Sequence, residues 1–197
     1  MNKKTLTKIN IGNIGVVDLN IPVLKIGSEN PRVLLICGIH GNETSGLFVI
    51  NQLLSNLPDI KGTLCIITSA NPLAQALKQR ENLLDLRDLN RVFPGDRKNE
   101  GISQIVASKI FTFAKEFDFV IDLHTFPEDC PVVAIAIKTS NKKVTELSET
   151  AIKAFNPDIV WELQHTTKRE AHFVGALGVK LAEAGVANFA VEMPPLE

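Results

Sequence analysis

The 197-residue sequence has few of the features that mark membrane, secreted or nucleic-acid-binding proteins. Its longest apolar runs, such as residues 33–37 and 132–137, are far too short to cross a bilayer. No apolar core follows the lysines of residues 1–10, so we expect no secretory signal. A net charge of −1 provides no electrostatic footprint for a nucleic acid. The composition therefore indicates neither a membrane nor a nucleic-acid partner.

Cysteine is also scarce, with only Cys37, Cys65 and Cys130 in the chain. An odd, widely spaced set argues against a disulfide framework and favours a reducing compartment, so we expect a cytoplasmic protein. Cys37 and Cys65 lie in apolar runs and are predicted to be small core residues.

The sequence contains no internal repeat and no Gly-, Ser- or Pro-rich linker, and 45% of its residues are apolar. A single domain over 1–197 is therefore predicted, with two strands in residues 1–30. Apolar runs predict further strands at residues 32–37, 62–69, 119–123, 132–137, 159–163 and 186–192. Apolar periodicity predicts helices at residues 44–57, 103–117, 141–155 and 170–184. This alternation predicts an α/β fold with three layers, α/β/α, around a mostly parallel mixed sheet.

Polar residues follow several predicted strands, at the sheet edge where sites of such folds form. His40 and Glu43 follow the first buried strand in an H-x-x-E pattern, and His124 ends a later strand. An imidazole and a carboxylate are ordinary zinc ligands. Taken singly, Glu43 also suits a helix start and His124 a core position. Asp122 shares the strand face of His124 and is a candidate to orient that imidazole.

Two further features lie between and after these residues. Glu192 ends the last apolar strand, where a carboxylate is costly unless it has a partner or a task such as general-base catalysis. Arg80, Arg87 and Arg91 lie close together, next to Asn90. Guanidinium forks bind carboxylates, but a solvated strand end and an exposed charged loop are the ordinary alternatives.

The order of these segments resembles the succinylglutamate desuccinylase/aspartoacylase family of the zinc carboxypeptidase clan, from about residue 33 to residue 192. The segments that carry the resemblance are GIHGNE at 38–43, ANP at 70–72, DLNRVFPG at 88–95, DLHT at 122–125 and AVE at 190–192. Combined in this order they are far more specific than any single motif.

The resemblance implies a zinc carboxypeptidase-like fold and one zinc ion per chain, held by His40, Glu43 and His124. It implies that Glu192 is the general base of a hydrolase. The substrate would be the amide bond of an N-acyl amino acid, or of a similar small molecule that bears a carboxylate.

The resemblance also implies that Asn90 and Arg91 bind the substrate carboxylate. Arg80 would polarise the scissile carbonyl, and Arg87 is its rival for that role. A metallocarboxypeptidase acting on peptides and a catalytically idle ligand-binding domain stay open as alternatives.

Family members usually continue for about a hundred residues in a β-rich C-terminal domain, a size typical of a small domain. Here the sequence ends five residues after Glu192 and contains no tyrosine. We therefore expect the catalytic domain alone. A sheet edge left exposed in this way would favour a homo-oligomer.

Overall fold

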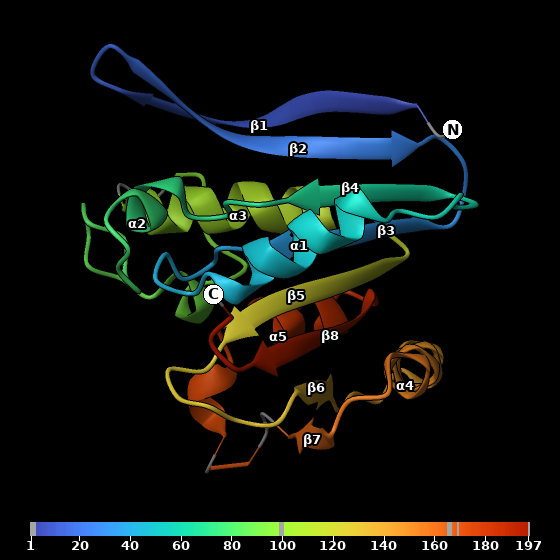
Figure 1. Ribbon diagram of the computed structural model, residues 1–197. Helices are drawn as coiled ribbons and strands as arrows, with labels where there is room; N and C mark the ends of the chain where they lie inside the picture. The colour runs from blue at the N-terminus through green and yellow to red at the C-terminus, as the bar shows by residue number, and fades with distance from the viewer. Residues whose placement is uncertain (1–2, 99–100, 165–166, 169, 197) are drawn as a thin grey trace.

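An eight-stranded mixed sheet forms the centre of the computed structural model, which describes residues 3–98, 101–164, 167–168 and 170–196 (Figure 1). Its strand order is β1-β2-β4-β3-β5-β8-β6-β7. The strands are β1 (Lys4–Ile14), β2 (Val17–Gly27), β3 (Arg32–Cys37), β4 (Thr63–Ile67), β5 (Phe119–Thr125), β6 (Val133–Ile137), β7 (Ile159–Leu163) and β8 (Ala187–Met193).

The central strands β4, β3, β5 and β8 run parallel to one another. The flanking strands vary: β2 is antiparallel to β4, β6 is antiparallel to β8, and β6 and β7 are parallel. The predicted mostly parallel mixed sheet is confirmed. Parallel neighbours end at the same edge of a sheet, so the segments that follow β3, β5 and β8 lie together.

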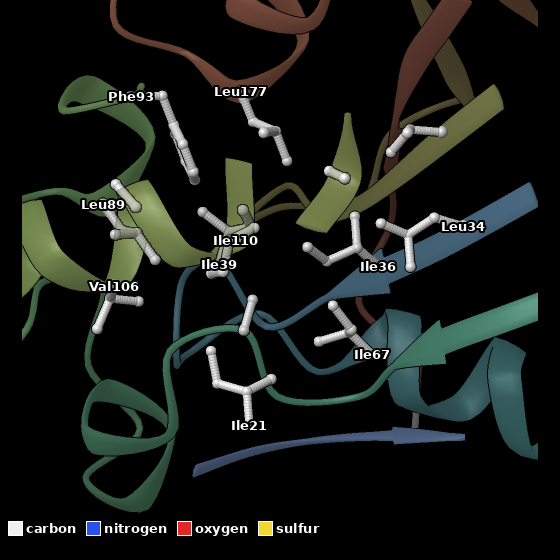
Figure 2. Close-up of a cluster of buried hydrophobic side chains, with 14 of the residues drawn as sticks. Ile21, Leu34, Ile36, Ile39, Ile67, Leu89, Phe93, Val106, Ile110 and Leu177 are labelled. Carbon is white, nitrogen blue, oxygen red and sulfur yellow. The ribbon is translucent and has the colours of Figure 1, made fainter. Parts of the chain in front are cut away.

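Helices cover both faces of the sheet, as predicted (Figure 1). The helices are α1 (Ser45–Ser55), α2 (Pro72–Ala76), α3 (Ile102–Ala114), α4 (Lys142–Phe155) and α5 (Leu177–Glu183), with 3-10 turns η1 (Leu89–Arg91) and η2 (Ala171–Phe173). A buried hydrophobic cluster lies on each face of the sheet, and successive side chains of β3 point alternately into one cluster and the other. Leu35 and Cys37 belong to the cluster of α1, whereas Leu34 and Ile36 belong to the cluster of α3, which Figure 2 shows.

The two strands predicted in residues 1–30 form a hairpin that extends the sheet at one edge. β1 pairs antiparallel with β2, and the second half of β2 pairs with β4. Ile11, Leu19 and Ile21 of the hairpin are buried in the same cluster as Val106 and Ile110 of α3. The hairpin therefore packs against α3, and β4 separates it from β3, β5 and β8 within the sheet.

The prediction of one continuous helix over residues 170–184 is wrong. The structure has two separate elements there, η2 and α5. The break lies at Gly175, which sits against the backbone of Arg91: an added Cβ would lie 2.0 Å from the Arg91 carbonyl oxygen. The Asn90 side-chain oxygen accepts a hydrogen bond from the backbone N–H of Leu177 at 2.9 Å. Contacts with a segment far away in sequence thus override the local periodicity.

Across the described ranges, no helix has the length and apolar character needed to span a membrane. The predicted burial of Cys37 and Cys65 is confirmed, and both are free thiols.

Candidate metal and substrate site

The proposed ligands converge because three parallel strands deliver them to one edge of the sheet. His40 and Glu43 follow β3, His124 lies at the end of β5, and Glu192 lies at the end of β8. His124 and Glu192 are direct neighbours in the β5–β8 ladder. This register places His124 and Glu192 beside one another at the carboxyl edge of the sheet, where the sequence predicted a site.

The loop after β3 is shaped by a close backbone approach. An added Cβ on Gly41 would lie 2.1 Å from the carbonyl carbon of Ala74 in α2, so a side chain has no room there. The backbone N–H of Glu43 donates to the His40 carbonyl at 3.3 Å and closes a tight turn. This turn lets both side chains face the same point before α1 begins.

The three side chains form a compact buried group. Glu43 Oε1 lies 2.6 Å from His40 Nδ1, and Glu43 Oε2 lies 2.8 Å from His124 Nδ1. One ligand atom from each residue lies within 4.8 Å of the others, and all three residues are buried. Two imidazole nitrogens and a carboxylate at this separation are a donor set that suits a divalent metal ion.

Each imidazole is held from behind by a second carboxylate. His40 Nε2 lies 2.9 Å from Asp88 Oδ1, and His124 Nε2 lies 2.9 Å from Asp122 Oδ2. Carboxylates in these positions fix the ring and its tautomer, so that Nδ1 can offer its lone pair to a metal. The contact of Asp122 was anticipated from its strand face. The contact of Asp88 was not, because 48 residues separate it from His40 and no local spacing indicates it.

The electrostatics of the two glutamates differ. Burial opposes ionisation of Glu43, but hydrogen bonds to His124 and His40 outweigh burial and hold its pKa below the ordinary range. Burial raises the pKa of Glu192, with His124 acting against the shift and Glu43 adding to it. Glu43 is therefore held ionised, and Glu192 is the more basic of the two carboxylates.

A cavity of about 70 Å³ opens beside His40, Glu43 and His124, which we call the metal-ligand group. Its walls include every predicted site residue except Glu43, which lies in an adjoining depression with Arg80 and Thr125. The lining residues are His40, Arg80, Asn90, Arg91, Asp122, His124, Ile135, Ile137, Trp161, Leu163, Phe173, Ala176, Gly178, Ala190 and Glu192.

The structure separates the two arginines that the sequence left as rivals. Arg80 lines the cavity, donates to Asp88 at 2.9 Å, and places its NH1 3.2 Å from Glu43 Oε1. Arg87 is exposed and is not among the residues of the cavity wall. Geometry thus brings Arg80, and not Arg87, to the metal-ligand group.

Asn90 and Arg91 also line the cavity and lie in η1. The bond from Leu177 to the Asn90 oxygen leaves the amide nitrogen of Asn90 as its donor toward a ligand. The Arg91 guanidinium carbon lies 4.9 Å from the centre of the Phe173 ring, and Arg91 NH1 donates to the Asn90 carbonyl at 2.9 Å. Both donors are therefore held in place by protein contacts.

Comparison with known protein families matches residues 29–195 to the succinylglutamate desuccinylase/aspartoacylase catalytic domain. Over 124 residues the chain is 31% identical to an N-alpha-acetyl-L-2,4-diaminobutyric acid deacetylase of Halomonas elongata. Over 107 residues it is 31% identical to a succinylglutamate desuccinylase of Yersinia enterocolitica. These matches cover 62% and 50% of this chain, but only 36% and 32% of the two relatives.

Solved structures agree with the fold. An aspartoacylase family protein from Mesorhizobium loti superposes with a TM-score of 0.81 at 25% identity, covering 98% of this chain and 62% of that protein. A metallo-carboxypeptidase from Burkholderia cenocepacia superposes with a TM-score of 0.74 at 15% identity, covering 97% and 55% respectively. The predicted carboxypeptidase-like architecture is confirmed.

Proposed function

The chain belongs to the succinylglutamate desuccinylase/aspartoacylase family, and from this premise we propose that it is a zinc-dependent hydrolase of small amides. Its substrate is the amide bond of an N-acyl amino acid, or of a similar small molecule that bears a carboxylate. The observation that carries the proposal is the buried His40–Glu43–His124 group beside a cavity that also holds Glu192 and Arg91. The curated relatives are named as a deacetylase and a desuccinylase, which supports the same reaction class.

His40, Glu43 and His124 would hold one zinc ion per chain. The donor set is one that zinc accepts, and the carboxylates of Asp88 and Asp122 already orient the two imidazoles. When bound, zinc lowers the pKa of a water molecule to about 7 and polarises a carbonyl group.

Glu192 serves as the proton carrier of the reaction. Its carboxylate takes a proton from the attacking water and later gives it to the nitrogen that leaves as an amine. Burial at the end of β8 raises its pKa, which makes it a stronger base for the first transfer than a solvated carboxylate.

The arginines and Asn90 supply orientation and charge. Arg80 stabilises the negative charge that develops on the carbonyl oxygen, a contribution whose loss typically costs about 10²–10³ in rate. Asn90 and Arg91 hold the substrate carboxylate and so fix the distance between the amide and Glu192.

The first test is the zinc content of the purified chain, with His124→Ala as its control. We expect about one zinc per chain, lost in His124→Ala, and hydrolysis of N-acetyl amino acids that a chelator abolishes. Glu192→Gln is the matched catalytic control, because it should keep the zinc and lose turnover.

Three results would contradict the proposal in different ways. Hydrolysis at full rate by His124→Ala would remove the metal from the mechanism. Action on peptides alone would indicate a carboxypeptidase, and ligand binding without turnover would indicate a binding domain. The cytoplasmic location, the single-domain organisation and the homo-oligomer stay predictions.

A further inference from the structure

The cavity beside the metal-ligand group has a polar side and an apolar side. His40, His124, Glu192 and the arginines form the polar side. Asn90 and Asp122 are also polar. The rest of the wall is apolar and is built by Ile135, Ile137, Trp161, Leu163, Phe173, Ala176, Gly178 and Ala190. The proposed catalytic roles account for the polar side and leave the apolar side unexplained.

Strand register shows how the apolar wall is built. Asp122, Ala190, Ile135 and Trp161 are direct neighbours in one row across β5, β8, β6 and β7. Adjacent strands lie about 4.8 Å apart, so this row extends roughly 14 Å from Asp122 to Trp161. The small side chain of Ala190 lies between Asp122 and Ile135, which leaves space directly next to the metal ligands.

The apolar wall is in contact with Arg91, the proposed anchor of the substrate carboxylate, through Phe173. The Trp161 ring packs edge-on against Phe173 at 5.7 Å, and Phe173 in turn carries the Arg91 guanidinium at 4.9 Å. The Trp161 indole nitrogen donates to Glu170 at 3.3 Å, which holds the ring in place. A substrate group against this wall therefore belongs to the same half of the substrate as the carboxylate on Arg91.

Charge in the cavity suits one substrate carboxylate and not two. Arg80 is already paired with Asp88 and Glu43, at 2.9 and 3.2 Å. Among the described residues, Arg91 is the cation of the cavity wall that has no carboxylate within ion-pair distance. A second carboxylate would lie against apolar side chains and near Glu192, where its desolvation would go uncompensated.

The cavity also limits size. Its volume is about 70 Å³, whereas a cavity of about 150 Å³ accommodates benzene. By that comparison the whole cavity, which the polar and apolar sides share, has room for about three carbon atoms, so only a small side chain fits against the apolar residues.

We propose that the carboxylate-bearing half of the substrate is a small aliphatic amino acid, with Trp161 and Ala190 setting the size of its side chain. This inference rests on the proposed function, because it assigns the amine product of that reaction. It separates this chain from a hydrolase that is selective for N-acylated acidic amino acids.

The test compares N-acetyl derivatives of glycine, alanine, valine, leucine, asparagine and aspartate on the zinc-loaded chain. Leucine, asparagine and aspartate have similar shapes, so they isolate the effect of polarity and charge. We expect kcat/KM to rise from glycine to valine and to be at least about tenfold higher for leucine than for aspartate. Equal or faster hydrolysis of the aspartate derivative would overturn the inference.

Trp161→Ala tests the wall directly. It should move the preferred side chain from valine toward leucine or larger, whereas Val160→Ala, on the half-exposed opposite face, should leave the preference unchanged. A general loss of stability would lower all rates together and would not change the ranking. An unchanged ranking in folded Trp161→Ala would refute the role of Trp161.

Binding to Glu192→Gln, measured by calorimetry, separates this inference from the proposed function. If no derivative is hydrolysed but valine and leucine derivatives bind about tenfold more tightly than the aspartate derivative, the function fails and the specificity of the cavity stands. Tighter binding of the aspartate derivative, or no binding of any derivative, would refute the inference.

Discussion

Replacing Gly175 by alanine should displace Arg91, the proposed anchor of the substrate carboxylate. It should leave the proposed zinc ligands and Glu192 in place. The added Cβ would lie 2.0 Å from the Arg91 carbonyl oxygen and 2.4 Å from its carbonyl carbon. Both are backbone atoms, so no side-chain rotation can relieve the contact. The segment before α5 must therefore move away from η1.

The cost can be worked out from the contacts that this movement breaks. Overpacking costs about 1–3 kcal/mol. The bonds from Phe93 N–H to the Gly175 carbonyl, 3.0 Å, and from Leu177 N–H to Asn90, 2.9 Å, would stretch, at about 1 kcal/mol each. Alanine recovers about 0.4–1 kcal/mol by restricting the unfolded chain. The net loss is about 2–4.6 kcal/mol, which lowers the Tm by roughly 4–18 °C in a domain of this size.

Thermal unfolding, zinc content and steady-state kinetics together test this reasoning. Gly175→Ala should keep its zinc but show a raised KM, since an anchor displaced by about 1 Å can cost up to 10²-fold in kcat/KM. Val174→Ala is the matched control, because its side chain is 43% exposed and its loss should change stability by less than about 0.5 kcal/mol. A Gly175→Ala protein with the Tm and KM of the parent would refute the argument that the close contact of Gly175 with Arg91 holds η1 in place.

Three further substitutions test the site. Asp88→Asn should weaken zinc binding about 10–100-fold, because the amide holds the His40 ring less firmly. Competition with a chelator would measure the change. An unchanged affinity would exclude Asp88 as an orienting group. Glu192→Gln should lower kcat about 10²–10⁴-fold with zinc retained, and a smaller effect in rapid-quench kinetics would assign proton transfer to another group. Arg91→Lys should raise KM more than it lowers kcat, because an ammonium group cannot form the planar fork that grips a carboxylate; a change confined to kcat would contradict its role as an anchor.

Much of the site was predictable from local patterns. Continuous apolar runs marked the buried strands, and polar residues at their carboxyl ends made His40, Glu43, His124 and Glu192 candidates. The family resemblance then implied their roles as metal ligands and general base. The choice of candidates worked because parallel strands end at a common edge, so sequence position along each strand already determines position in space.

Other features depended on contacts between distant segments. The periodicity of residues 170–184 favoured one helix, but the close approach of Gly175 to Arg91 and the cap from Asn90 divided it. Likewise, the pairing of Asp88 with His40 and the choice of Arg80 over Arg87 follow from how the loop before α3 folds over the sheet. No short-range spacing encodes such a path.

The sequence by itself therefore determined the layered α/β class and the strand ends, because hydrophobic periodicity and strand geometry are local properties. The metal-ligand candidates came from the order of the motifs and the family that this order resembles. Only the tertiary structure decided which carboxylates orient the two imidazoles and which apolar side chains line the cavity beside them. The row from Asp122 through Ala190 and Ile135 to Trp161 joins four strands whose register arises from packing of the whole sheet. Register depends on long-range pairing, and the chain order of β5, β6, β7 and β8 does not reveal that β8 lies between β5 and β6.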